Sequence, residues 1–227
     1  PGNHRLMDPE DHAASMIDKL YGQAAEIDVR PLGLSDVIDA SSGDIETVEA
    51  ISGALVNGAD KYGFAIMNGE LAILSSRIKC AANVFGTMIS LAKPGMKDGV
   101  GYFSDGSEFV VFHPRGYAVY MNSDGVGTKT EFYERAGKYT GALRDSLAMK
   151  LDDAVKIGAK IKVVYDVVET KGRIPVSELR KAANDLGSNM GFDYMLYHAP
   201  SGGRLGGWNE RTAFNMSGSA VSVIDEN

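Results

Sequence analysis

One short stretch of the chain holds residue types that bind phosphate and metal ions. The sequence Ser123-Asp124-Gly125-Val126-Gly127-Thr128-Lys129 follows an apolar run and precedes a long helical segment. An aspartate can hold a divalent metal, and a lysine with unused backbone N–H groups can meet phosphate oxygens. The glycines let a backbone approach a ligand closely. The spacing is not that of the Gly-x-x-x-x-Gly-Lys-Ser/Thr phosphate loop, so an ordinary glycine-rich turn explains the pattern equally well.

Two adjacent carboxylates, Asp152 and Asp153, lie on the helix expected after this stretch. Neighbouring helix positions point about 100° apart, so only one of the two is expected to face the strand ends. That carboxylate would join Asp124 around a Mg²⁺ ion that bridges nucleotide phosphates, because magnesium needs only one or two carboxylates besides phosphate oxygens and waters. A solvated helix face is the alternative explanation.

A third candidate is the glycine-rich loop of residues 202–207, which contains Arg204. The planar guanidinium suits an anionic ligand, while a mobile surface loop is an equally good explanation. His198, just before the loop, is expected to be an ordinary strand-end histidine. Tyrosines that alternate along the strands are expected to pack on the sheet first and to contact ligands second.

Hydrophobic periodicity predicts the elements that position these residues. Asp8 and Pro9 resemble an N-cap followed by a first-turn proline. Residues 27–43 are expected to be an extended arm, flexible or bound to a partner. Asn68-Gly69 predicts a tight hairpin turn, and 113–116 predicts the turn of a second hairpin. Helices are expected over 9–21, 44–58, 130–158 with breaks near Gly137 and Gly141, and 175–190, and strands over 63–67, 70–79, 108–112, 117–121, 161–168, 194–197 and 217–224.

This pattern predicts an α+β fold in which a mixed or antiparallel sheet packs with helices, rather than a doubly wound fold. We expect an N-terminal helical arm over residues 1–60 and an α+β domain over 61–227. The net charge of −7 argues against a broad nucleic-acid or acidic-membrane surface. The single cysteine, Cys80, and the lack of a membrane-length apolar run favour a cytoplasmic protein.

Two motifs together resemble the aminoimidazole ribonucleotide synthetase (phosphoribosylformylglycinamidine cyclo-ligase) family. The first is Asp-Gly-Val-Gly-Thr-Lys at residues 124–129. The second is Leu-Ala-Met-Lys-Leu-Asp-Asp-Ala-Val-Lys-Ile-Gly-Ala at 147–159, which is similar to the family's Val-Ala-Met-x-x-Asn-Asp-x-x-x-x-Gly-Ala helix. The strand at 162–168, the helix at 175–190 and the strand at 217–225 follow in the family's order. The resemblance covers residues 62–225.

The resemblance implies an N-terminal-domain-like fold that pairs with a second copy into a β-barrel, and ATP-dependent closure of an imidazole ring in purine biosynthesis. Asp124, Lys129 and Asp153 would be the catalytic residues. Asp124 and Asp153 would hold Mg²⁺. Gly125, Gly127 and Thr128 would shape the ATP loop. Arg204, which the family pattern lacks, is a further candidate cofactor contact from its own glycine-rich loop. The implied partners are a small-molecule nucleotide substrate, a homodimer mate and a separate chain that supplies the family's second domain.

Three departures from the family keep other functions open. Asp152 replaces the usual asparagine, residues 201–206 replace a glutamate-containing segment, and the second domain is expected to be missing. A non-catalytic homolog, acting as a dimeric assembly or regulatory module, is therefore the alternative. A weaker one is another member of the same superfamily, such as a selenophosphate, thiamine-phosphate or hydrogenase-maturation kinase-like protein.

Overall fold

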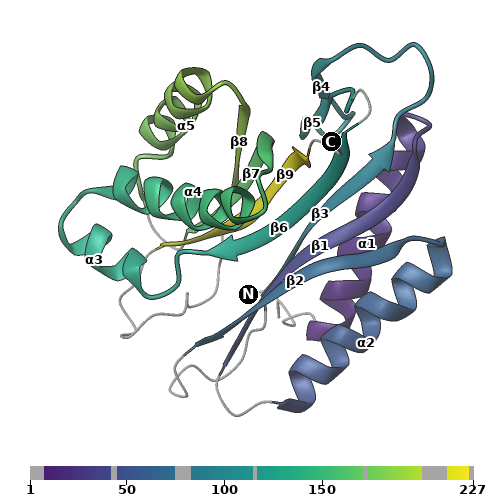
Figure 1. Ribbon diagram of the computed structural model, residues 1–227. Coiled ribbons are helices and arrows are strands. Elements are labelled where there is room, and N and C mark those ends of the chain that lie inside the picture. Colours follow the sequence, from purple (N-terminus) through teal and green to yellow (C-terminus); the bar gives the residue numbers. More distant parts are fainter. Residues whose placement is uncertain are drawn as a thin grey trace.

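The computed structural model describes residues 8–41, 45–74, 83–114, 117–170, 173–200 and 214–224. Two mixed sheets lie face to face, and helices cover their outer faces, which gives four layers (Figure 1). This arrangement confirms the α+β fold with a mixed sheet. The elements in chain order are α1 (Pro9–Glu26), β1 (Arg30–Ser41), α2 (Ile45–Tyr62), β2 (Ala65–Leu74), β3 (Asn83–Leu91), β4 (Gly99–Tyr102), β5 (Glu108–Val111), β6 (Ala118–Gly125), α3 (Lys129–Arg135), α4 (Tyr139–Lys156), β7 (Lys160–Thr170), α5 (Val176–Met190), β8 (Asp193–Pro200) and β9 (Phe214–Ile224).

The first sheet has the strand order β2-β1-β3 and the second has the order β6-β9-β7-β8. Each sheet contains one parallel pair, β1 with β2 and β7 with β8, and its other pairs are antiparallel. Strands β4 and β5 form a separate two-stranded hairpin. None of the helices in the described ranges is long and apolar enough to cross a membrane.

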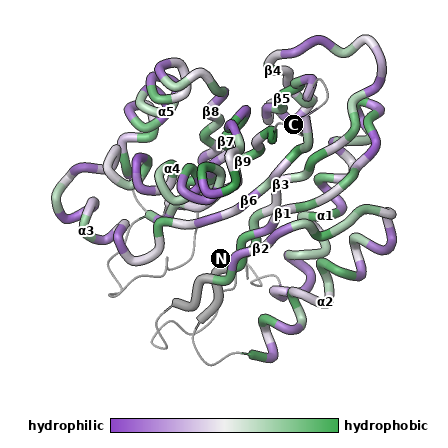
Figure 2. Tube along the Cα trace, in the orientation of Figure 1, coloured by the Kyte–Doolittle hydropathy of each residue, from purple (hydrophilic) through white to green (hydrophobic). Residues whose placement is uncertain are grey.

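Helices α1 and α2 pack against each other and cover the outer face of the first sheet. The Asp8 side chain accepts a hydrogen bond from the Glu10 backbone, as the predicted N-cap requires, and α1 continues past residue 21 to Glu26. The predicted end of α2 at Gly58 is wrong, because the helix continues to Tyr62. Gly58 instead allows a close helix contact, since a Cβ there would lie 2.6 Å from Ile17 Cδ1. Figure 2 shows hydrophobic and hydrophilic residues alternating along these helices.

The prediction of a flexible or partner-bound arm over residues 27–43 is wrong. Strand β1 is the central strand of the first sheet and pairs along its length with β2 and β3. Leu34 and Ile38 are buried against α1 and α2, in the same apolar cluster as Ile17 and Ile51. Residue 60, where the expected boundary falls, lies inside α2.

The predicted hairpin turn at Asn68-Gly69 is also wrong. Strand β2 runs straight through both residues and pairs in parallel with β1, where Ser35 and Asp36 are their partners. Gly69 is needed for space rather than for a turn, because a Cβ there would lie 2.9 Å from the Asp36 carboxylate. The Asn68 amide donates a hydrogen bond to Met121 O of the second sheet.

The strands expected to form the second hairpin do not pair with each other. Strand β5 pairs with β4, a glycine-containing strand that the sequence pattern does not predict. Strand β6 pairs with β9. The Phe109 ring lies over Gly101, where a Cβ would be 2.3 Å from the ring. Residues 115 and 116 of the expected turn lie outside the described residues.

The second sheet has two buried faces. On β7, Val164 and Val168 face helices α4 and α5, whereas Val163 faces the first sheet and the hairpin. The expected break in the helical region occurs at Gly137, whose φ of +64° ends the α3 segment, but Gly141 lies inside α4. Helix α4 therefore lies directly over the sheet that carries the Asp124 stretch (Figure 1).

Candidate functional site

The stretch from Asp124 to Lys129 forms a strand–turn–helix connection at the end of β6. Val126 N donates to Met216 O of β9 at 2.9 Å, and this bond fixes the end of the strand. Gly127 then adopts φ +60°, a left-handed conformation that favours glycine. Helix α3 begins at Lys129 with Thr128 as N-cap, but the Thr128 hydroxyl makes no capping bond. In the described part of the chain, the N–H groups of Gly127, Thr128 and Lys129 donate no hydrogen bond.

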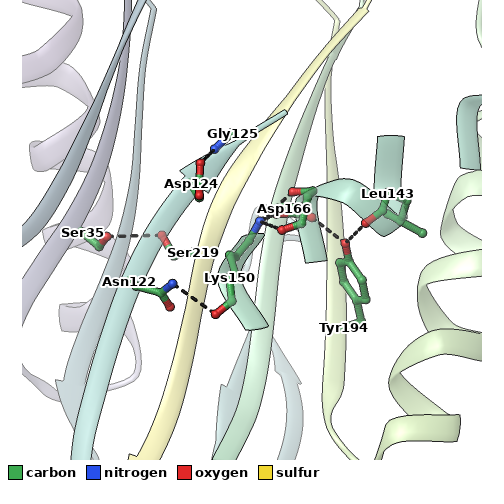
Figure 3. Close-up of polar contacts among 10 residues, drawn as sticks. Ser35, Asn122, Asp124, Gly125, Leu143, Lys150, Asp166, Tyr194 and Ser219 are labelled. Carbon is green, nitrogen blue, oxygen red and sulfur yellow. Dashed lines mark hydrogen bonds and ion pairs between the residues drawn. The ribbon is translucent and has the colours of Figure 1, made fainter. Parts of the chain in front are cut away.

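Asp124 is half-buried at this strand end, and its Oδ1 accepts a hydrogen bond from Gly125 N at 2.7 Å (Figure 3). Side chains alternate along a strand, so Asp124 shares a face with Asn122, whose amide lies 3.3 Å from Lys150 O of α4. Ser123 points the other way and donates to Asp36 O of the first sheet at 3.1 Å. The Asp124 carboxylate therefore lies on the helix side of the second sheet.

Lys129 turns back toward α4. Its ammonium lies 3.2 Å from Asp145 Oδ2 and 3.5 Å from Met149 Sδ, and its side chain is 45% exposed. An exposed ion pair of this kind contributes about 1 kcal/mol or less, so it yields easily to a stronger anion. The Lys129 charge is thus paired within the protein but remains reachable from solvent.

Asp153 lies on α4 beside the middle of β6. Its Oδ1 accepts a hydrogen bond from Lys156 at 2.9 Å, and its Oδ2 lies 3.5 Å from the Asn122 amide. Burial and, secondarily, the Asp153 charge raise the pKa of Tyr120, which places that tyrosine near the same carboxylate. The hydrogen bond to Asp153 raises the pKa of the exposed Lys156.

The two proposed metal ligands therefore lie at different points along β6. Asp153 contacts Asn122, and Asp124 is two residues further on, which corresponds to about 7 Å of strand. The described residues contain no group of three or more His, Cys, Asp or Glu side chains that could hold a metal ion. Asp152, next to Asp153, is exposed. Arg204 and the loop of residues 202–207 lie outside the described residues.

A buried charged pair that sequence reasoning missed lies directly beneath this site. Lys150 of α4 and Asp166 of β7 are both fully buried, and Lys150 Nζ lies 2.9 Å from Asp166 Oδ1. The Lys150 ammonium is close to Asp166 Oδ1 but is not aligned for a hydrogen bond. This carboxylate oxygen is therefore stabilised by the positive charge of Lys150. Lys150 Nζ also donates to Ser146 Oγ at 2.6 Å and to Ser146 O at 3.0 Å.

Tyr194 of β8 completes this buried network (Figure 3). Its hydroxyl lies 2.5 Å from Asp166 Oδ2 and 3.4 Å from Leu143 O of α4. Burial, followed by the negative charge of Asp166, raises the pKa of Tyr194 well above its usual value. The network ties α4 to two strands of the second sheet, and through Lys150 O it also orients Asn122 between Asp124 and Asp153.

A signal for this pair exists in the sequence. Lys150 interrupts the apolar stripe formed by Leu143, Leu147 and Ala154, and Asp166 interrupts the β-branched run of β7. Charged residues are almost never fully buried unless they are paired. Lys150 and Asp166, two opposite charges that each interrupt a buried apolar run, therefore predict a buried ion pair that no sequence motif indicates.

Asp36 is a second buried acid that the sequence analysis did not single out. It is 5% exposed, lies beside Gly69 of β2, and accepts at its backbone oxygen from Ser123. Burial raises the pKa of the Asp36 carboxyl to about 6. His198, by contrast, is hydrogen-bonded to Thr170 Oγ1 at 2.7 Å, and burial with the nearby Arg180 charge lowers its pKa.

Comparisons with known proteins give weak structural similarities. No protein-family model matches the sequence, and no curated protein matches it either. Thiamine monophosphate kinase from Aquifex aeolicus aligns at 10% identity and a TM-score of 0.35 over 99% of this chain and 80% of that chain. The hydrogenase maturation protein HypE from E. coli aligns at 10% identity and a TM-score of 0.32 over 96% of this chain and 74% of that chain.

A third structure, tt0281 from Thermus thermophilus, aligns at 13% identity and a TM-score of 0.35 over 98% of this chain and 69% of that chain. At these scores the alignments carry no conclusion about activity, and membership of the cyclo-ligase family stays a prediction. The functional proposal therefore rests on the motifs and on the geometry of the site.

Proposed function

We propose that the turn at residues 124–129 binds the phosphates of ATP and that the chain is, or is the first domain of, an ATP-dependent cyclo-ligase of the purine-biosynthesis type. The observation that supports this most is the turn itself. Its three backbone N–H groups make no bond within the described chain, and they stand between a carboxylate at the strand end and a lysine at the helix start. Consecutive N–H groups of this kind form an anion-binding concavity.

The side chains around the turn fit a magnesium nucleotide. The N–H groups of Gly127 and Thr128 would face phosphate oxygens, and Lys129 would exchange Asp145 for phosphate. Asp124 and Asp153 lie at different points along β6, so the proposal does not need both of them to bind one ion. Mg²⁺ needs only one or two carboxylates and completes its coordination shell with phosphate oxygens and water. A phosphate chain that runs from the turn toward Asn122 would thus place either carboxylate beside a metal.

ATP, when bound, supplies the phosphoryl group that activates an amide oxygen for displacement by a neighbouring amine. The residues of this chain would hold the nucleotide, neutralise its charge and orient it. The nucleotide substrate would bind in the cleft completed by a second copy of this chain and by a separate second-domain chain. A homodimer would therefore be needed to complete the substrate cleft.

Titration calorimetry with Mg-ATP tests the nucleotide site. We expect binding by the wild-type chain and at least a tenfold loss in Asp124→Ala and in Asp153→Ala. Asp152→Ala is the matched control, because Asp152 is exposed on the same helix next to Asp153. A wild-type chain without Mg-ATP affinity in any oligomeric form, or equal losses in Asp152→Ala and Asp153→Ala, would refute the assignment.

One observation favours the non-catalytic alternative, a dimeric assembly or regulatory module. Lys129 and Asp153 are each already paired on α4, with Asp145 and Lys156 respectively. A site whose charges neutralise one another needs no nucleotide for stability. This alternative predicts a stable dimer without nucleotide binding and unchanged folding of the Asp124→Ala/Asp153→Ala double variant, measured by sedimentation and by urea unfolding.

A further inference from the structure

A cavity of about 480 Å³ lies on the opposite face of the second sheet from the phosphate-binding turn. Helix α1, strand β3, the β4–β5 hairpin and the second sheet form its walls. We propose that this cavity binds an uncharged, largely apolar small molecule and that the β4–β5 hairpin is its lid. Pockets of roughly 300–1,000 Å³ take small molecules of drug or cofactor size.

The second sheet forms the floor of the cavity. Val163, Tyr165 and Val167 alternate along β7 and all face this side, opposite Val164 and Asp166 on the helix side. Met195 of β8 continues the same surface. Burial raises the pKa of Tyr165 to about 12, so this surface is poorly solvated. A floor of this composition offers contact area to an apolar ligand and almost no partner for a charged one.

The basic side chains at the walls are already paired with acids, which favours an uncharged ligand over an anion. Lys19 of α1 is paired with Asp105 at 3.1 Å, and His113 is paired with Asp98. Glu108, exposed at the rim, carries a negative charge that repels an anion. An anion would have to displace Asp105 or Asp98 from these two basic side chains, whereas an uncharged ligand leaves both pairs in place.

The hairpin that covers the cavity has the properties of a lid. Its strands are four residues each, and a two-stranded hairpin is only marginally stable by itself. Solvent-accessible polar contacts hold it to α1: Ser104 N donates to Glu26 Oε1 at 2.6 Å, and the Gln23 amide donates to Ser107 Oγ at 2.8 Å. On the inner side, Val110 packs toward Met195 and the floor. Contacts of this kind are individually weak, so the hairpin can open without disturbing either sheet.

Fluorescence titration of the full chain with N-phenyl-1-naphthylamine, a neutral apolar fluorophore, tests the site. The structure offers a matched pair of variants, because Val110 lines the cavity and its ladder partner Val100 does not. We expect saturable binding to the wild type, at least a tenfold loss in Val110→Phe, and unchanged binding in Val100→Phe. Thr87→Phe repeats the test from the β3 wall in case the hairpin variant folds poorly.

The lid is tested by the rate of fluorophore association in stopped-flow mixing. Glu26→Ala removes both acceptors of the Ser104 contacts and should raise the association rate severalfold, while Glu49→Ala on the exposed face of α2 should not. Absence of saturable binding, or equal affinities in Val110→Phe and Val100→Phe, would overturn the binding site. Another outcome is a chain that sediments as a dimer and excludes the fluorophore at every concentration. This result would show that a second copy covers this face, and it would also refute the small-molecule site. An unchanged association rate in Glu26→Ala would refute the assignment of the β4–β5 hairpin as a lid. None of these fluorescence and sedimentation results depends on nucleotide binding.

Discussion

The buried pair of Lys150 and Asp166 predicts a stability effect of unusual size for a lysine substitution. In Lys150→Met the side chain keeps its length but loses the ammonium that lies 2.9 Å from Asp166 Oδ1. Both residues are 0% exposed, so water cannot replace the missing charge. Tyr194 still donates to Asp166 Oδ2, but a single hydrogen bond does not solvate a buried carboxylate.

The magnitude follows from leaving one charge of a buried pair without its partner. Such changes cost about 3–5 kcal/mol of unfolding free energy. Removing the second charge as well should recover part of this loss, so Lys150→Met/Asp166→Asn should be more stable than Lys150→Met alone by at least ~1 kcal/mol. Lys156→Met is the matched control on the same helix, because Lys156 is 68% exposed and its loss should leave the urea midpoint nearly unchanged.

Urea unfolding of the four proteins at pH 7, followed by far-UV circular dichroism, measures these differences. The reasoning fails if Lys150→Met unfolds at the same urea concentration as Lys156→Met. It also fails if the double variant is no more stable than Lys150→Met, since the penalty would then come from packing rather than from the unpaired charge.

Three further outcomes are expected. Gly58→Val should lower the unfolding free energy by about 1–3 kcal/mol in urea unfolding, because a Cβ there would lie 2.6 Å from Ile17 Cδ1. Ile17 is buried, so Ile17→Ala is destabilising by itself, but the double variant should lose less than the sum of the two single losses. Burial raises the pKa of Asp36 from 3.8 to about 6, so the folded state holds the proton more tightly. The resulting stability is fully present below pH 3.8 and is lost as the pH rises through about 6, so Asp36→Asn should flatten stability over this range and gain about 3 kcal/mol at pH 7. Gly127→Ala should cost about 1 kcal/mol in the same assay, because φ is +60°.

Local signals in the sequence were sufficient to locate the helices and the strands of the second sheet, but not to pair those strands. The strand–turn–helix at residues 118–135 forms where the motif predicts it, because a glycine with positive φ and a buried β-branched residue impose it locally. The Asp8 cap is equally local. Elements whose conformation depends on their nearest neighbours in sequence can be predicted from composition and spacing.

Tertiary packing overrode the local signal in the first sheet. Asn68-Gly69 has the composition of a hairpin turn, yet β2 passes straight through it because Gly69 makes room for the Asp36 side chain of β1. Strand β1 itself contains Pro31 and Gly33, which indicate a loop when read alone. Its central place depends on pairing with β2 and β3, and no local pattern encodes that pairing.

The candidate site was predictable only in part for the same reason. The turn residues are contiguous, so their common location follows from the sequence. The offset between Asp124 and Asp153 along β6 depends on how α4 lies on the sheet, and the contacts of Asn122 and Lys150 fix that position. Neither residue belongs to a recognisable motif, and their roles arise from distant strands.

Strand β9 has a consequence for how the protein forms during synthesis. It lies between β6 and β7 in the second sheet, although both are translated before it, and Ala118 pairs with Ile224 across this long interval. Until β9 leaves the ribosome, β6 and β7 present unpaired edges and cannot join each other in register. Pairing over such sequence distances is slow, and exposed edges invite association with other chains. The sheet that carries the turn at residues 124–129 is thus completed late, and nascent chains should need protection until residues 214–224 emerge.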